Sequence, residues 1–406
     1  MPNRETETVA EPQQWLTRGV AGIGTASLLS DLGHEIPTSL LPSFLTTTLG
    51  APAAALGLIE GVADGLAGFS KLAGGPLADD PHRRRDTAVV GYTATAALTA
   101  AIGLSTAVWQ VAALRAAGWA ARGLRVPSRN ALLADVVPEA AYGRAYGFER
   151  AMDNLGAIGG PLLAILLVSL VGVRTSILLS VIPGLLAAGA IVYAVRHAPP
   201  LGERERKPMR LRIRPVLRGR LGRLFVGVGA FELGNAAATL LILRATDLLD
   251  KNHPHERAVN IALLLYAGYN LAATLASLYG GRLGDRRGSL TVLSIGVAAF
   301  LLAYTGFAFS GSSIVALGLA FLVAGIGIGF VETAEHAAVA TLAPNALRGS
   351  AFGFLAATQS FGNLISSAVA GLVWTLVSPT AAFLLLAATM VVSLVGLTLA
   401  RQPRAT

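Results

Sequence analysis

Stretches of about 20 or more mostly apolar residues recur along nearly the whole chain, and they constrain its fold more than any other feature. An α-helix needs about 20 apolar residues to cross a bilayer. Of the 406 residues, 53% are hydrophobic and 14% are charged, whereas about a quarter of the residues in a water-soluble domain are charged. Twelve such segments can be counted, at residues 16–43, 50–78, 86–107, 108–128, 143–172, 174–195, 221–248, 259–283, 288–310, 313–335, 348–376 and 379–400. We therefore expect an all-α polytopic membrane protein with twelve transmembrane helices.

Helices are expected rather than strands because the segments lack the alternation of barrel strands, and a helix satisfies its own backbone polar groups in lipid. The first apolar segment is long and follows a polar start, so we expect it to stay in the membrane rather than to be cleaved. Cysteine is absent, which excludes disulfides, thiol catalysis and thiolate metal sites.

Arginine and lysine gather in the even-numbered connections between segments. The second connection has Arg83 and Arg84, the eighth has Arg286 and Arg287, and the tenth has Arg348. Because cytoplasmic loops carry the excess of basic residues, both termini and all even connections are expected to be cytoplasmic. The net charge of +9 reflects mostly this bias, so we expect the lipid bilayer, and no nucleic acid, as a partner.

The two halves of the chain repeat each other at an offset of 206 residues. The residues that recur at this offset are Gly75, Leu77, Asp79, Pro138, Ala140, Gly143, Ala145, Gly147, Phe148, Ala151 and Gly156. We expect a cytoplasmic tail at 1–15, a six-helix half at 16–196, a basic cytoplasmic linker at 197–220, a second six-helix half at 221–400 and a tail at 401–406. Internal repeats of this size are typical of secondary transporters, whose substrate site lies between the halves near the bilayer midplane.

One pattern occurs between the second and third helices of each half. The first copy has Gly75, Leu77, Asp79, Arg83 and Arg84, and the second has Gly281, Leu283, Asp285, Arg286 and Gly288. The pattern resembles the G-x-L-x-D-R-x-G-R-K fingerprint of the major facilitator superfamily, with Asp80 and His82 replacing two usual residues of the first copy. The resemblance implies the major facilitator fold of two pseudo-symmetric six-helix halves. It also implies that these residues form a gate latch that stabilises one of two access states.

Two further signatures resemble the antiporter subgroup of that superfamily. In helix five, Gly156, Gly160 and Pro161 resemble the motif G-x-x-x-G-P-x-x-G-G, although small residues also serve ordinary helix packing. In helix four, Arg115 ahead of Gly118 resembles a membrane-embedded arginine. Three more arginines share its helical face: Arg122, Arg125 and Arg129.

Charged and polar side chains inside apolar segments are costly unless they face a cavity or pair with each other. Besides the arginines, this set comprises Asp31, His34, Glu35, Glu60, Asp64, Glu232, Asn235, Glu332, Glu335 and His336. A carboxylate in a low-dielectric cavity can take up and release protons near neutral pH. Asp31 and Glu35 suit this role best, because helix one lines the central cavity in the family that the chain resembles. Arg115 is expected to drive proton release from them.

Some of these charges have a structural alternative, in which carboxylates balance the arginines of helix four or close a gate. Glu149, Arg150 and Asp153 lie near the predicted cytoplasmic end of helix five, so we expect them at a gate.

Other classes of function have less support. His34 with Glu35, and Glu335 with His336, offer ligands for a divalent metal, but no H-x-x-x-H pattern is present and we expect no metal site. No Walker A loop or G-x-S-x-G motif is present, and the glycines of residues 325–330 lie in an apolar helix where they favour packing. We expect no enzymatic activity and no cofactor.

The resulting expectation is a monomeric secondary active transporter of the cell inner membrane that works by alternating access. The leading hypothesis is export of a small organic compound in exchange for protons. Two alternatives stay open: proton-coupled uptake of a polar or anionic solute, with Arg115 holding the anion, and a sensor or assembly partner without transport.

Overall fold

The computed structural model describes residues 15–200, 210 and 212–401. This part of the chain contains fourteen α-helices and no β-strand. The helices are α1 (Arg18–Ser43), α2 (Ala53–Ala78), α3 (Pro81–Ala101), α4 (Val108–Asp135), α5 (Tyr142–Leu179), α6 (Val181–Arg196), α7 (Ile213–Val216), α8 (Gly219–Glu232), α9 (Ala238–Leu249), α10 (His255–Arg287), α11 (Ser289–Phe309), α12 (Ile314–Leu342), α13 (Arg348–Leu376) and α14 (Pro379–Arg401). Nearly all of both predicted tails, and residues 201–209 and 211 of the predicted linker, lie outside the described residues.

Side-chain caps fix where two of the helices begin. Thr17 Oγ1 accepts a hydrogen bond from a backbone N–H in the first turn of α1. Asp80 Oδ1 accepts hydrogen bonds from the N–H groups of His82 at 2.9 Å and Arg83 at 3.2 Å, and Pro81 occupies the first helical position. Asp80, which departs from the family fingerprint, therefore has a local role: it starts α3 five residues before the predicted position 86.

Each of the twelve predicted segments is mostly helical. The fifth and sixth segments are separated by a kink within α5 at Gly172, whose φ of 76° and ψ of 169° interrupt the helix. This left-handed backbone region favours glycine, which has no Cβ to clash.

The seventh segment, predicted as one helix at 221–248, is instead broken into α8 and α9, so that expectation was wrong. The break exposes backbone groups that α13 satisfies. Asn363 Nδ2 donates to the Asn235 carbonyl at 2.9 Å, and the Ala237 N–H donates to Ser367 Oγ at 2.8 Å. Irregular backbone at membrane depth persists where the protein supplies such partners.

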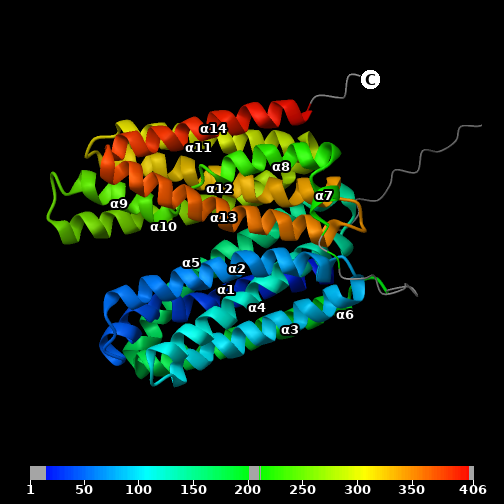
Figure 1. Ribbon diagram of the computed structural model, residues 1–406, viewed down its shortest axis with the longest axis horizontal. Coiled ribbons are helices and arrows are strands. Elements are labelled where there is room, and N and C mark those ends of the chain that lie inside the picture. The colour runs from blue at the N-terminus through cyan, green and yellow to red at the C-terminus, as the bar shows by residue number, and fades with distance from the viewer. Residues whose placement is uncertain (1–14, 201–209, 211, 402–406) are drawn as a thin grey trace, which may run out of the picture.

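The helices form two bundles, one of α1–α6 and one of α8–α14, as Figure 1 shows. They meet mainly where α2 packs on α13 and where α5 packs on α10. The architecture is therefore all-α with two halves, as the internal repeat predicted.

By length and composition, six helical stretches in the described part of the chain can cross a membrane: 81–104, 139–196, 255–287, 289–309, 314–342 and 379–398. The longest of them contains both α5 and α6 and the kink between the fifth and sixth predicted segments. Helices α1, α2 and α4 are long as well, but they carry many of the charged side chains considered next.

Candidate functional site

Glycines bring the two halves into close contact along two seams. A Cβ added at Gly147 of α5 would lie 2.3 Å from the carbonyl oxygen of Ser277 in α10. On the second seam, a Cβ added at Gly353 of α13 would lie 2.8 Å from the Cα of Gly75 in α2. Backbones approach this closely only where side chains are absent, so larger residues would push the halves apart.

The seam between α2 and α13 is closed at one end and open at the other. Toward the closed end, a Cβ at Gly68 would lie 3.0 Å from the ring of Phe361. At Gly57, Gly61 and Gly65, which follow the same helical face, an added Cβ would meet no atom within 4 Å. The two helices therefore diverge toward the N-terminal end of α2.

An aspartate from each half caps a helix of the other half at the closed end. Asp79, at the end of α2, accepts the Ser350 N–H at 2.8 Å and also the hydroxyl of that serine, in the first turn of α13. Asp285, near the end of α10, accepts the N–H groups of Gly143 at 2.7 Å and Arg144 at 3.2 Å, in the first turn of α5. Arg144 Nε also donates to Asp285 at 2.6 Å. A carboxylate at a helix N-terminus satisfies free N–H groups and suits the helix dipole.

A third charged contact joins the halves beside these caps. Asp135, at the end of α4, pairs with Arg84 of α3 and lies 3.7 Å from Arg348 Nη1 of α13. Arg348 also donates to the Tyr142 hydroxyl at 3.2 Å. Together with the two caps, these contacts form what we call the latch: Asp79, Ser350, Asp285, Gly143, Arg144, Asp135, Arg84 and Arg348.

The remaining residues of the predicted latch lie close to this end. Arg83 lies in the first turn of α3. Arg286 lines a surface pocket together with Asp285 and Arg144. Gly288 has a φ of 85° and ends α10, so it fixes the turn into α11.

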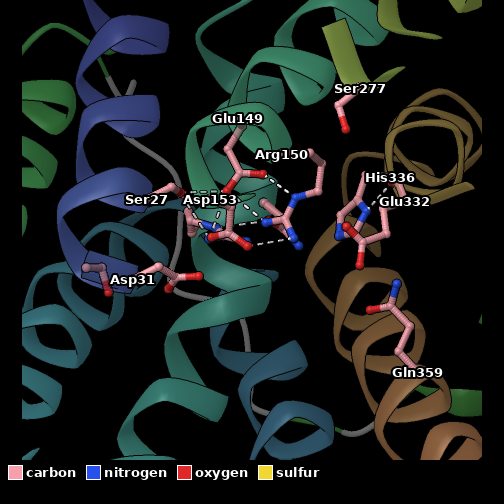
Figure 2. Close-up of polar contacts among 12 residues, drawn as sticks. Ser27, Asp31, Glu149, Arg150, Asp153, Ser277, Glu332, His336 and Gln359 are labelled. Carbon is pink, nitrogen blue, oxygen red and sulfur yellow. Dashed lines mark hydrogen bonds and ion pairs between the residues drawn. The ribbon is translucent and has the colours of Figure 1, made fainter. Parts of the chain in front are cut away.

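A network of four charges, Arg129, Glu149, Arg150 and Asp153, lies inside the first half, and the last three are labelled in Figure 2. Glu149, which is 1% exposed, pairs with Arg129 Nη1 at 2.8 Å and Arg150 Nε at 2.7 Å, and accepts the Ser27 hydroxyl at 2.6 Å. Asp153 lies 3.5 Å from Arg129 and 3.2 Å from Arg150. Glu149, Arg150 and Asp153, expected at a gate, thus tie α1, α4 and α5 together within one half, and Arg150 and Asp153 also face the second half across a cavity described below.

Two other arginines of α4 have separate partners. Arg122 Nη2 pairs with Asp31 of α1 at 2.8 Å. Arg115 forms a two-pronged contact with Glu60 of α2, with both hydrogen bonds at 3.1 Å, and donates to Thr38. In this state Arg115 is therefore held by Glu60, and Arg122 rather than Arg115 lies beside Asp31.

Three carboxyl groups of the second half lack basic partners, and two of them, Glu232 and Glu335, are buried. In the described residues, Glu232, Glu332 and Glu335 form no ion pair. Their contacts are neutral: Asn235 Nδ2 donates to Glu232 at 3.1 Å, and Gln359 Nε2 donates to Glu335 at 3.0 Å.

A cavity of about 270 Å³ lies between the two halves. Its charged and polar lining comprises Lys71, Arg122, Arg125, Arg129, Arg150 and Asp153 from the first half, and Glu232, Asn235, Glu332, His336, Gln359 and Asn363 from the second. A second cavity of about 420 Å³ shares Lys71, Gln359 and Asn363 with it and adds Asp64 and Trp119. We call the first of these the central cavity.

Other predicted site residues have packing roles or neutral surroundings. His34 packs edge-on against the Trp119 ring, with centroids 4.8 Å apart. A Cβ at Gly160, which precedes Pro161 in α5, would lie 2.3 Å from the Cβ of Glu35, and one at Gly156 would be equally crowded by α1. These small residues therefore hold α1 tightly on α5.

No group of three metal-ligating side chains occurs in the described part of the chain. Gly325 and Gly329 of the glycine run lie against the backbone of α10, which agrees with a packing role.

The prediction did not assign Lys71, Gln359 or Asn363 to the site, although all three line both cavities. Lys71 had a signal, since it is a cation within an apolar segment. The two amides had none, because neutral polar residues are common in such helices.

Comparisons with known proteins agree with this architecture. The family model described as Major Facilitator Superfamily matches residues 23–248 and 236–406. An uncharacterised MFS-type transporter of Methanocaldococcus jannaschii is 26% identical over 92% of each chain, and an uncharacterised protein of Mycobacterium tuberculosis is 27% identical over 84% of this chain and 82% of its own.

Two solved structures share the fold. The human organic anion transporter MFSD10 aligns with a TM-score of 0.72 at 17% identity, over 94% of this chain and 99% of its own. A bacterial homologue of the iron transporter ferroportin, in an outward-facing state, aligns with a TM-score of 0.72 at 16% identity, over 95% of this chain and 98% of its own. With the doubled latch and the repeated halves, these matches show that the chain is a multi-pass membrane protein that belongs to the Major Facilitator Superfamily of transporters.

Proposed function

We propose that this protein is a proton-coupled secondary transporter that exports a small organic solute in exchange for protons. Alternating access would expose the central cavity to one side of the membrane at a time. The closed latch and the diverging ends of α2 and α13 suit a state that is open toward the outside. This orientation rests on the basic even-numbered connections, from which we expect the latch end and both chain termini to be cytoplasmic.

The observation that carries the proposal is the contrast between the walls of the central cavity. Glu232 and Glu332 line it without a basic partner, and Glu335 lies buried beside them. Burying an unpaired carboxylate is costly, whereas burying the protonated acid is not. These glutamates are therefore suited to exchange a proton for a positively charged or hydrogen-bond-donating part of the solute.

This proposal assigns proton coupling to glutamates of the second half, whereas the sequence suggested Asp31 and Glu35 of α1. Asp31 already has Arg122 beside it at 2.8 Å, so a basic partner is available to its carboxylate. Glu35 lies in α1 near the arginines of α4 and remains a secondary candidate. The central cavity does not include Arg115, which is held by Glu60, so the anion-uptake alternative would have to rely on Arg122 or Lys71 instead.

The proposal includes a monomer in the cell inner membrane. A sensor or assembly partner without flux remains the alternative from another class. The closed latch alone suits such a protein equally well, but the open end of the seam and the polar central cavity favour a route for a solute.

The first test is a search for a ligand by thermal stability in detergent at pH 6 and pH 8. Because solute and protons compete for Glu232 and Glu332, hits should stabilise the protein more at pH 8 than at pH 6. A ligand at 100 times its Kd adds about 2.7 kcal/mol to the stability of the folded state.

The best hit is then loaded into proteoliposomes, and its efflux is driven by an inward proton gradient. We expect efflux in the parent protein. In the variant carrying Glu232→Gln and Glu332→Gln, the proton-driven flux should be slower by about a hundredfold or more, because side chains positioned to transfer a proton typically raise a rate by that factor. Glu256→Gln, at an exposed residue of α10, is the matched control. Unchanged flux in the double variant would remove these residues from coupling.

A further inference from the structure

The geometry points to a small zwitterion as the solute of the central cavity, with its anionic group on the first half and its cationic group on the second. This inference rests on the proposed function and names the substrate class of that same site. It follows from how the charges of the described residues divide between the two walls.

The wall from the first half offers positive charge that no carboxylate neutralises. Lys71 Nζ donates to the Ser360 hydroxyl at 2.6 Å and forms no ion pair among the described residues. Arg125 donates to the Ser30 hydroxyl at 2.6 Å and lies 3.7 Å above the Tyr92 ring, again without a carboxylate. The other cations of this wall belong to balanced groups, because Arg129 and Arg150 face Glu149 and Asp153.

Donor groups on this wall are also left over for a ligand. Arg122 gives one nitrogen to Asp31, but its Nη1 is buried and has no hydrogen-bond partner. The Nε and Nη1 atoms of Arg125 are likewise buried without partners. Unsatisfied buried donors are costly, and a carboxylate, sulfonate or phosphonate at this wall would satisfy them once the two guanidinium groups turn toward the cavity.

The wall from the second half presents the opposite chemistry. Glu232 and Glu332 line it as acceptors, and Asn235, Gln359 and Asn363 supply neutral polar groups between them. Among the described residues of this wall, none is lysine or arginine, and His336 hydrogen-bonds through Nδ1 to the Glu332 carbonyl at 2.7 Å. An ammonium group, or a quaternary amine, would be held here by charge.

The size of the central cavity limits the ligand further. Its volume of about 270 Å³ lies just below the range of about 300–1,000 Å³ for small-molecule sites. A compound of amino-acid size fits such a space, whereas larger drug-like compounds would have to extend into the adjoining cavity. The positive and negative walls face each other across this space, so a ligand with one charge leaves the opposite wall unpaired.

We would test this by measuring binding at a fixed pH of 7.5 with probes that share one branched alkyl chain and differ in their charged groups. Leucine carries both charges, 4-methylpentanoate only the negative one and 3-methylbutylamine only the positive one. The other common amino acids, taurine and glycine betaine complete the zwitterion set. We expect at least one zwitterion to stabilise the parent protein with a Kd at least about tenfold lower than either of its single-charge analogues.

Two variants then separate the walls. Lys71→Gln should weaken binding of the zwitterion and of the anionic analogue but not of the amine. Glu332→Gln should weaken binding of the zwitterion and of the amine but not of the anionic analogue. If Lys71 or Glu332 had only a structural role, its substitution would weaken binding of all three probes alike. Lys251→Gln and Glu256→Gln, both at exposed positions, are the matched controls for each lost charge.

The inference is overturned if none of the zwitterions binds, or if a single-charge analogue binds as tightly as its zwitterion. The two proposals fail in different ways. Proton-driven flux of other compounds without zwitterion binding would contradict only the substrate class. Zwitterion binding with the predicted split between the variants, but without proton-driven flux, would contradict only the proposed transport.

Discussion

Replacing Glu149 by glutamine should lower the free energy of unfolding by about 3–5 kcal/mol, because it leaves buried arginines without their shared partner. Glu149 is 1% exposed, and it contacts both Arg129 and Arg150 within 2.8 Å. Asp153 can balance only one of these two charges. Glutamine keeps the size of the side chain, so the loss is of charge rather than of packing.

The measurement is the unfolding of purified protein in detergent, followed by intrinsic fluorescence against temperature and denaturant. Glu256→Gln removes an equivalent charge from an exposed position and should change stability by less than about 0.5 kcal/mol. If Glu149→Gln behaves like this control, the charges inside the first half do not form the stabilising network described here.

Replacing Asp79 and Asp285 together by asparagine should shift the protein away from the state in which the latch is closed. Each carboxylate caps a helix of the opposite half, and a hydrogen bond to a charged group contributes about 1.5–3 kcal/mol. Losing both should therefore reduce the population of the closed-latch state relative to the open one by roughly a hundredfold or more. Both residues belong to the repeat, so each single variant should give about half of the free-energy change.

The absence of cysteine from the sequence makes this shift simple to follow. Gly61→Cys places a thiol on the open part of the α2 face, where an added Cβ meets no atom within 4 Å. We expect a membrane-impermeant maleimide added outside intact cells to label it quickly in the parent and much more slowly in the double variant. Asp86→Asn, at an exposed residue near the latch end of α3, is the control and should leave labelling unchanged. Equal labelling of all three proteins would show that the caps do not hold the latch closed.

Much of the latch was predictable because the repeat carries it. Gly75 and Asp79 recur at Gly281 and Asp285, and Gly143 recurs at Gly349. The structure pairs each Asp copy with the start of a helix from the other half, so one offset in the sequence describes both seams. Motifs at helix ends can be recognised in a sequence because their residues lie at fixed spacings along the chain.

The pairing of the interior charges was not predictable in the same way. Arg115 and Arg122 lie on one face of α4 and are seven residues apart, so the sequence gives them equal access to Asp31. Which one reaches it depends on how α1 and α2 are placed along α4, and the structure gives Asp31 to Arg122 and Glu60 to Arg115.

The break between α8 and α9 was missed for a similar reason. The segment 221–248 is apolar enough to read as one helix. Its interruption depends on Asn363 and Ser367, which lie about 130 residues further along the chain and supply the missing hydrogen bonds. A contact at that separation leaves no local pattern in the segment itself.

The most direct test of the proposed exchange is to count protons when the solute binds. Purified protein in a lightly buffered detergent solution near pH 7.5 would be mixed with the best ligand from the thermal search, and a pH-indicator dye would record the change. We predict release of up to about one proton per bound ligand, because the solute displaces protons from Glu232 and Glu332, and little release in the variant that carries both Glu→Gln changes. Uptake of protons on binding, or release that the double variant leaves unchanged, would contradict the account.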